Sequence, residues 1–435
     1  MIALLDLRSE HHTGVRLSRL LPRPSTDVAS AEAAAHQLVE DVRSRGVEAL
    51  LEQAERFDGV RPPAIRVPLA DLDRALQTLA PDVRGALEEA IARVRQASAA
   101  QVPPERVTRI ADGAEIVQRW QPVSRVGLYV PGGKAVYPSS VVMNVVPAQV
   151  AGVGSIAVAS PAQRAFGGAV HPVILGAARL LGIEEVYAMG GAGAIGAFAH
   201  GVESLGLDPV DVITGPGNVF VAAAKRAVKG VVGIDSEAGP TEILILADDA
   251  ADPRVIAADL ISQAEHDELA AAVLVTDSDD LAARVITELE RQVPATRHSE
   301  RVRAALTGPQ SAIVLVRDLD EGADVSNAYA PEHLEIQTVD PESLLARIDN
   351  AGVVFLGRSA PVSLGDYLAG SNHVLPTGGQ SRFSSGLGTS TFLRPQQVVR
   401  YSADALAAVR DGIRALSDAE DLPAHGDAVD ARFSE

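Results

Sequence analysis

Cysteine is absent from this sequence of 435 residues, and its absence removes three kinds of chemistry. The chain can form no disulfide, offer no thiolate to a metal and use no thiol nucleophile. Any metal must therefore be held by nitrogen and oxygen atoms. Aromatic residues are also scarce, at 3% of the chain, so its cores must be built from Ala, Val, Leu and Ile. Close packing of such residues is typical of parallel sheets covered by helices.

Net positive charge and an uninterrupted apolar segment are missing as well. The formal net charge of −19 argues against nucleic-acid binding and mildly favours a cationic small substrate over an anionic one. Residues 135–163 carry no charge, but Pro138, Asn144 and Pro147 interrupt them, so we interpret this segment as a buried helix and strand rather than a membrane span. Residues 1–21 show no signal peptide, and we expect a cytoplasmic protein.

What the sequence does contain is a regular alternation of helical and strand patterns. Strands are predicted near residues 126–130, 155–159, 185–189, 210–214, 241–247, 272–276, 312–316 and 353–356. Helices are predicted near residues 28–45, 69–79, 81–101, 254–265, 280–292 and 403–416. This order indicates an α/β fold with two Rossmann-like parallel-sheet domains of similar architecture, preceded by N-terminal helices and followed by an extended C-terminal tail.

The same pattern divides the chain into four parts. We expect a mainly helical N-terminal segment at residues 1–110 and a first α/β domain, on the dinucleotide side, at 111–236. A second α/β domain at 237–382 would carry the metal-binding and catalytic residues. The tail, residues 383–435, has one amphipathic stretch and is too thin to fold alone, so we expect it to cross to a second subunit.

Three glycine-rich turns follow predicted strands in the first α/β domain. Gly191, Gly193 and Gly196 have the spacing of a dinucleotide-binding turn, and residues 215–218 and 130–133 also lie between a strand and a helix. Each turn alone is equally well explained as a tight connection. Three in succession favour a nucleotide, whose phosphates the backbone N–H groups of helix N-termini would bind.

Four polar islands interrupt the apolar C-terminal half of the chain, at residues 263–266, 331–333, 366–373 and 420–425. In a helix, Gln263 and His266 share one face, a spacing that suits two ligands of one ion but also a surface hydrogen bond. Adding Asp366 and His425 gives two imidazoles, a carboxylate and an amide, a set of donors that zinc accepts.

Glu332 and His333 are neighbours in sequence, and adjacent side chains diverge on a regular strand or helix. A shared role would therefore require an irregular loop at a cleft. The alternative is a capping histidine beside a solvated glutamate. His373 follows Asp366 in another glycine-rich loop.

Six motifs in combination make the sequence resemble the histidinol dehydrogenase family over nearly its whole length. They lie at residues 127–133, 214–218, 238–242, 262–266, 330–334 and 370–376. The resemblance implies a zinc-dependent homodimer with shared active sites and one zinc ion per subunit. It also implies oxidation of L-histidinol through L-histidinal to L-histidine, the last two steps of histidine biosynthesis, with reduction of two NAD molecules.

The resemblance also assigns roles to residues. The zinc ligands, which also touch substrate, would be Gln263, His266, Asp366 and His425, the last donated by the partner subunit. The catalytic pair would be Glu332 and His333, and His333 would touch substrate too. Further substrate contacts would come from Thr241, where the family commonly has Ser, and from His373 and Glu420. Positions that contact NAD match Tyr129 and Asn218.

One position departs from the family pattern. Gly193 stands where the family usually has a Gln that contacts NAD, so the glycine spacing noted above arises partly from this substitution. Loss of the amide would weaken NAD binding by about 1 kcal/mol unless water or backbone replaces its hydrogen bond.

The residues themselves suggest how such a reaction would run. A neutral His333 would take the hydroxyl proton while a hydride leaves to NAD. Without cysteine the aldehyde cannot form a thioester, so water must add to it, with Glu332 activating that water. Zinc would anchor the amino and imidazole nitrogens of the substrate. Alternatives are a zinc hydrolase, a two-domain solute-binding protein and a dehydrogenase of another amino alcohol.

Overall fold

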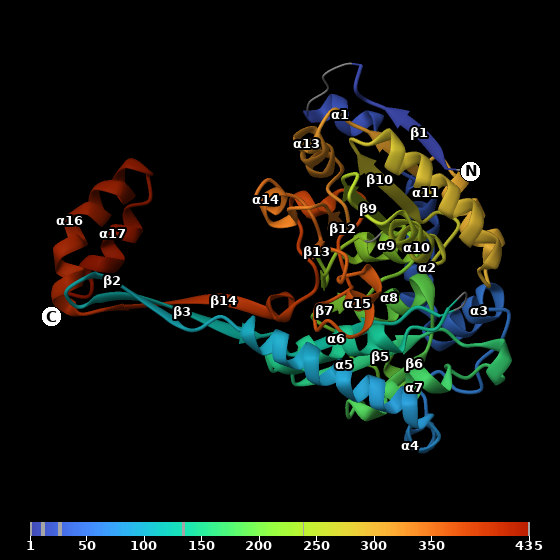
Figure 1. Ribbon diagram of the computed structural model, residues 1–435. Coiled ribbons are helices and arrows are strands. Elements are labelled where there is room, and N and C mark those ends of the chain that lie inside the picture. Colours follow the sequence, from blue (N-terminus) through green and yellow to red (C-terminus); the bar gives the residue numbers. More distant parts are fainter. Residues whose placement is uncertain (1, 10–13, 25–27, 133–134, 238, 434–435) are drawn as a thin grey trace. The chain divides into compact units, whose positions relative to one another are not determined.

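The computed structural model of the protein describes residues 2–9, 14–24, 28–132, 135–237 and 239–433 (Figure 1). Gly133 of the third glycine-rich turn and Ala238 of the third family motif lie outside these residues. The chain forms two compact units, the first from residues 1–101 and 123–392 and the second from residues 102–122 and 393–435. The finer division at residues 110, 236 and 382 stays a prediction.

A parallel six-stranded sheet in the first unit has the order β1-β11-β10-β9-β12-β13. Its strands are β1 (Ala3–Asp6), β9 (Glu242–Ala247), β10 (Ala271–Thr276), β11 (Ala312–Leu315), β12 (His333–Gln337) and β13 (Val353–Leu356). Its helices are α1 (Gly14–Leu20), α10 (Pro253–Ala264), α11 (Asp279–Gln292), α12 (Ser299–Thr307), α13 (Leu319–Tyr329), α14 (Pro341–Leu345) and α15 (Val362–Tyr367). All of β9 and β10 is buried because helices cover both faces, which explains their continuous runs of Ala, Val, Ile and Leu.

A second parallel sheet in the same unit has the order β6-β5-β4-β7-β8. Its strands are β4 (Arg125–Tyr129), β5 (Ser155–Ser160), β6 (Glu185–Ala188), β7 (Val212–Thr214) and β8 (Gly233–Ile234). Its helices are α6 (Pro138–Ala151), α7 (Pro172–Leu180), α8 (Gly191–His200) and α9 (Val219–Val228). The chain order reverses between β4 and β7, and in sheets of this kind ligands bind at the carboxyl ends of the two strands flanking that point.

The N-terminal helices pack on this second sheet. They are α2 (Val28–Arg45), α3 (Val47–Phe57), α4 (Leu69–Gln77) and α5 (Pro81–Ala100), at nearly the bounds predicted for three of them. Helix α2 contacts α8 and α9, α4 contacts α7, and α5 contacts α6. The uncharged segment 135–163 is α6 followed by β5, and no described helix is long and apolar enough to cross a membrane.

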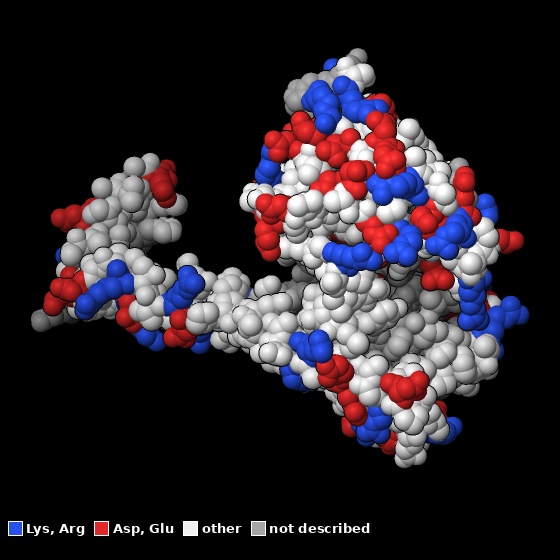
Figure 2. All heavy atoms as spheres, viewed as in Figure 1, with Lys and Arg blue, Asp and Glu red and all other residues white. Residues whose placement is uncertain are grey.

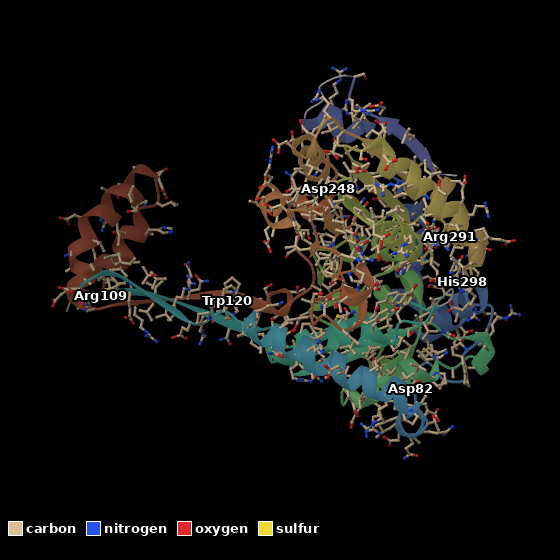
Figure 3. All side chains as sticks on the ribbon, viewed as in Figure 1. Asp82, Arg109, Trp120, Asp248, Arg291 and His298 are labelled. Atoms are coloured by element: carbon tan, nitrogen blue, oxygen red, sulfur yellow. The ribbon has the colours of Figure 1, made fainter. Side chains whose placement is uncertain are left out.

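The second unit has an antiparallel sheet of order β14-β3-β2 and two helices that pack on each other. Its elements are β2 (Arg106–Ala111), β3 (Ala114–Pro122), β14 (Leu393–Tyr401), α16 (Ala403–Ala419) and α17 (Pro423–Asp430). Arg109 and Trp120 lie on the neighbouring strands β2 and β3 (Figure 3). None of these three strands was predicted. β2, for example, is exposed along its whole length and lacks the buried apolar face that marks a strand in a sequence.

Charge is mixed on the visible face of the first unit. Acidic and basic side chains are interspersed over the helices of the six-stranded sheet (Figure 2). Many form ion pairs, such as Arg291 with Glu288 along α11 and Arg284 of the same helix with Asp249 in the turn after β9. The net charge of −19 therefore does not by itself mark a binding site for a cation.

Candidate active site

The amino ends of β9 and β12, which are neighbours in the six-stranded sheet, bring three predicted residues together. Thr241 directly precedes β9, Glu332 directly precedes β12, and His333 is the first residue of β12. Glu332 lies in a bend and His333 opens the strand, so the pair stands where irregular backbone meets regular structure. Both adjacent side chains reach the start of β9 because strand pairing places that segment beside them.

Glu332 is a buried carboxylate with two hydrogen bonds. Its Oε2 accepts from Thr241 Oγ1 at 2.6 Å and from the backbone N–H of Glu242 at 2.9 Å. Burial raises the pKa of Glu332 to about 8, although these hydrogen bonds oppose the rise and nearby Asp366 adds to it. A carboxylate with a pKa in this range accepts protons near neutral pH far better than an exposed one.

His333 is held in one tautomer. Its Nδ1 lies 3.1 Å from the carbonyl oxygen of Glu242, which can only accept, so Nδ1 carries the proton. Burial lowers the pKa of His333 and keeps the ring neutral. Its Nε2 is buried and has no hydrogen-bond partner among the described residues. This nitrogen therefore presents an unused lone pair, as a general base requires.

One residue that the sequence did not single out holds both members of the predicted catalytic pair. The backbone N–H of Glu242 binds Glu332, and its carbonyl binds His333. Its own carboxylate is fully buried, lies 3.1 Å from Arg23 Nη1 and accepts from the N–H of Gly378 at 3.1 Å. Burial raises the pKa of Glu242 to about 7. An acid at the start of an apolar strand was the available signal for Glu242; Arg23 had none.

The predicted metal ligands of the first unit cluster beside this pair. Gln263, at the end of α10, donates from Nε2 to Thr241 Oγ1 at 2.7 Å, which turns its carbonyl oxygen the other way. The ring of His266 stacks on Tyr137, with centroids 6.5 Å apart. Burial lowers the pKa of His266, and the nearby Asp366 carboxylate opposes that shift.

His373 joins the two sheets at this site. Its Nδ1 lies 3.0 Å from the carbonyl oxygen of Asp366, so Nδ1 is protonated, and its Nε2 accepts from Ser140 Oγ at 3.0 Å. Ser140 belongs to α6, next to the five-stranded sheet, whereas Asp366 belongs to α15. Burial lowers the pKa of His373, which keeps the ring neutral.

The remaining predicted ligand and substrate contact lie in the second unit. Glu420 is the C-cap of α16, His425 lies on α17, and both side chains are exposed. In the part of the chain that is described, no three His, Asp or Glu side chains converge to hold a metal by themselves. The first unit thus supplies one amide, one imidazole and one carboxylate, a set that needs a further ligand.

The predicted dinucleotide residues lie at the carboxyl ends of β4 and β7. Gly215 has φ +119°, and a Cβ there would lie 1.9 Å from the carbonyl oxygen of Tyr129, so only glycine fits. Asn218 caps α9, accepting from the N–H groups of Phe220 and Val221. The buried hydroxyl of Tyr129 accepts from the N–H of Gly191 at 3.2 Å, and burial raises the pKa of Tyr129 to about 12.

Gly193 faces the N-terminal helices. A Cβ at this position would lie 2.4 Å from Oε1 of Gln53 on α3, and one at Gly196 would lie 3.1 Å from the backbone of Val39 on α2. Both glycines therefore allow α8 to pack closely against α2 and α3. This packing accounts for the glycine spacing without a phosphate contact.

Comparisons with known proteins agree with this arrangement. A family model described as histidinol dehydrogenase matches residues 21–433. The chain is 68% identical over 431 residues to histidinol dehydrogenase of Leifsonia xyli subsp. xyli, covering 99% of both proteins. It is 62% identical over 433 residues to that of Thermobifida fusca, covering 100% of this chain and 98% of the relative. A crystal structure of histidinol dehydrogenase from Elizabethkingia anophelis matches with a TM-score of 0.90 at 31% identity, covering 98% of this chain and 99% of that one. The chain belongs to the histidinol dehydrogenase family.

Proposed function

We propose that this protein oxidises L-histidinol through L-histidinal to L-histidine, the last two steps of histidine biosynthesis, and reduces two NAD molecules. The observation that carries the proposal is the buried pair of Glu332 and His333 beside Gln263, His266 and Asp366. This pair supplies a carboxylate and a neutral imidazole at one place, which oxidation of an alcohol and then an aldehyde requires.

The first oxidation uses His333. The alcohol gives its hydroxyl proton to Nε2 of His333, and its carbon gives a hydride to NAD, leaving the aldehyde and NADH. The carbonyl of Glu242 holds the proton on Nδ1 and so keeps Nε2 available. His333 then passes its proton to water, which restores the neutral base for the second oxidation.

The second oxidation begins with water. Glu332 accepts a proton from the water molecule as its oxygen bonds to the aldehyde carbon, giving the anion of the hydrate. This anion gives its remaining carbon-bound hydrogen as a hydride to a second NAD, while His333 accepts the proton of its hydroxyl group. The product is the carboxylate of L-histidine. No thioester is involved, since the chain has no cysteine.

We propose one zinc ion per subunit, held by Gln263, His266 and Asp366 and by His425 of the partner subunit. The residues of the first unit fit such an ion: burial favours neutral His266, and Gln263 turns its carbonyl oxygen away from Thr241. Bound zinc would hold the substrate's amino and imidazole nitrogens. Thr241, His373 and Glu420 would complete the substrate site.

We further propose that the protein is a homodimer whose subunits share their active sites. The second unit exposes large apolar side chains, among them Val107 at 58%, Ile110 at 57%, Val399 at 63% and Leu416 at 68%. Such a concentration in a small unit with little core of its own favours burial against another chain. Exposed Glu420 and His425 would then enter the partner's site.

NAD would bind at the carboxyl ends of β4 and β7, beside Tyr129 and Asn218. An absorbance assay for NADH with L-histidinol, with and without a chelator, tests the whole proposal. We expect two NADH per L-histidinol and loss of activity with the chelator, reversed by zinc. Chelator-sensitive hydrolysis without NADH would instead identify a zinc hydrolase.

A further inference from the structure

The loops that follow β4, β5 and β6 meet at one point on the carboxyl edge of the five-stranded sheet. A Cβ on Gly132, after β4, would lie 3.0 Å from Pro161, after β5. A Cβ on Gly190, after β6, would lie 2.8 Å from the same proline. The ring of Pro161 therefore packs against the backbone of the other two loops here, at the edge where sheets of this topology bind dinucleotides.

A carboxylate from outside the sheet reaches this point. Asp58, the C-cap of α3, places Oδ2 3.5 Å from where a Cβ on Gly190 would lie, and its charge acts on the hydroxyl of Tyr129. Burial raises the pKa of Asp58 to about 6. Among the described residues, no cation or hydrogen-bond donor compensates its half-buried carboxylate. Such a group is costly unless a ligand satisfies it.

Two further polar groups near the same loops lack partners within the described chain. Oγ of Ser160, the last residue of β5, is buried without a hydrogen bond. Nε2 of Gln163 is also buried without one, and it lies 3.1 Å from where a Cβ on Gly132 would be. Buried polar atoms without partners are rare in native proteins, so their presence in the loop that packs on Gly132 and Gly190 points to a polar ligand.

The position of these groups indicates which part of a bound dinucleotide they would contact. In doubly wound sheets, an acidic residue near the end of the second strand accepts hydrogen bonds from the adenosine ribose. The second strand here is β5, which ends at Ser160 and is followed by Pro161, so neither its end nor the next residue supplies an acid. We propose that Asp58 replaces that acid, binding the 2′- and 3′-hydroxyls of the adenosine ribose and rejecting the 2′-phosphate of NADP. The inference rests on the proposed use of NAD.

Binding of the reduced dinucleotides by the dimeric, zinc-loaded protein, followed by their fluorescence, tests this role without relying on turnover. For Asp58→Asn, we expect the Kd for NADH to rise about tenfold, because charge-assisted hydrogen bonds from the ribose are weakened. The Kd for NADPH should stay constant or fall, since a repelling charge is gone. The preference for NADH over NADPH should thus fall at least tenfold.

Glu55→Gln is a matched control. Glu55 lies exposed on the same helix, so its substitution removes the same charge without touching the loops, and both Kd values should stay unchanged. Asp58→Glu keeps the charge, and should still reject NADPH while binding NADH more weakly. This variant also provides the test if Asp58→Asn does not fold.

The outcomes separate this inference from the proposed function. An unchanged preference in folded Asp58→Asn or Asp58→Glu, with the wild-type protein binding NADH, overturns the role of Asp58 alone. A lower melting temperature with an unchanged preference for NADH over NADPH would also overturn the role of Asp58, because it would assign this residue a structural role only. Failure of the wild-type protein to bind NADH overturns both.

Discussion

Replacing Glu332 with Gln removes the proposed water-activating charge and alters little else. The oxygen of the Gln side chain can still accept the two hydrogen bonds that Thr241 and the Glu242 N–H now donate to Oε2. The two side chains have nearly the same volume, so the surrounding packing is kept. What the variant lacks is a group that accepts a proton.

The size of the effect follows from the raised pKa. Keeping the charge of Glu332 in this site, with the pKa raised from 4.5 to about 8, costs at most about 5 kcal/mol. Between these pH values the folded state keeps a proton that the unfolded state has released, so the free energy of unfolding falls as the pH rises. The Gln variant does not titrate, and we expect it to gain stability relative to the wild type across this window.

The kinetic effect should be confined to one half-reaction. A positioned general base contributes about 10²–10⁴ in rate, so oxidation of L-histidinal by the variant should slow by about that factor. Oxidation of L-histidinol, which uses His333, should slow far less. In the wild type, aldehyde oxidation should rise with pH and level off near the pKa of Glu332, about 8. The variant should lack this rise.

Single-turnover measurements of NADH formation from each substrate would separate the two steps, and urea unfolding of metal-free protein would report stability. Glu335→Gln is the control, because Glu335 is also buried on β12 and burial raises its pKa to about 8. Its carboxylate accepts hydrogen bonds from the N–H of Val362 and from Nε2 of Gln337, and none from Thr241 or Glu242. Equal losses in both half-reactions, or a stability difference that does not vary with pH, would refute the reasoning.

Two further predictions concern the shared site and its support. His425→Asn should abolish tight zinc binding, and mixing it with Glu332→Gln should restore part of the activity in heterodimers; no recovery at any mixing ratio would argue against donation across the interface. Arg23→Met removes the cation that faces the buried Glu242 carboxylate, so kcat should fall at least tenfold while the Kd for NADH is unchanged. Equal kcat values in Arg23→Met and the wild type would show that Glu242 holds the pair unaided.

The sequence predicts best those elements whose pattern is set by burial alone. Strands β9 and β10 and helix α10 lie within a residue or two of their expected bounds, because continuous apolar runs and helical spacing reflect packing on a core. Strands β2 and β14 have no such pattern, because almost all of their side chains are exposed. Their identity as strands depends on hydrogen bonds to β3, which follows β2 after a short turn but is far away in sequence from β14.

The site is predictable to the extent that its residues form unusual local groups. Islands of imidazole, carboxylate and amide pointed to Gln263, His266 and Glu332. Arg23 and Asp58 lie in ordinary polar surroundings in the sequence, and their importance appears only when folding places them beside Glu242 and Gly190. Contacts between distant segments leave no periodic signal, which is why sequence reasoning missed both.

One short segment of chain links the two sheets, and hydrogen bonds hold both of its ends. Residues 235–241 link β8 of the five-stranded sheet to β9 of the six-stranded sheet. At one end, Asp235 accepts from the N–H of Gly215 and pairs with buried Lys225, so it fixes the turn at the carboxyl end of β7. At the other end, Thr241 donates to Glu332. Hydrogen bonds to buried carboxylates therefore anchor the described residues at both ends of the link between the two sheets.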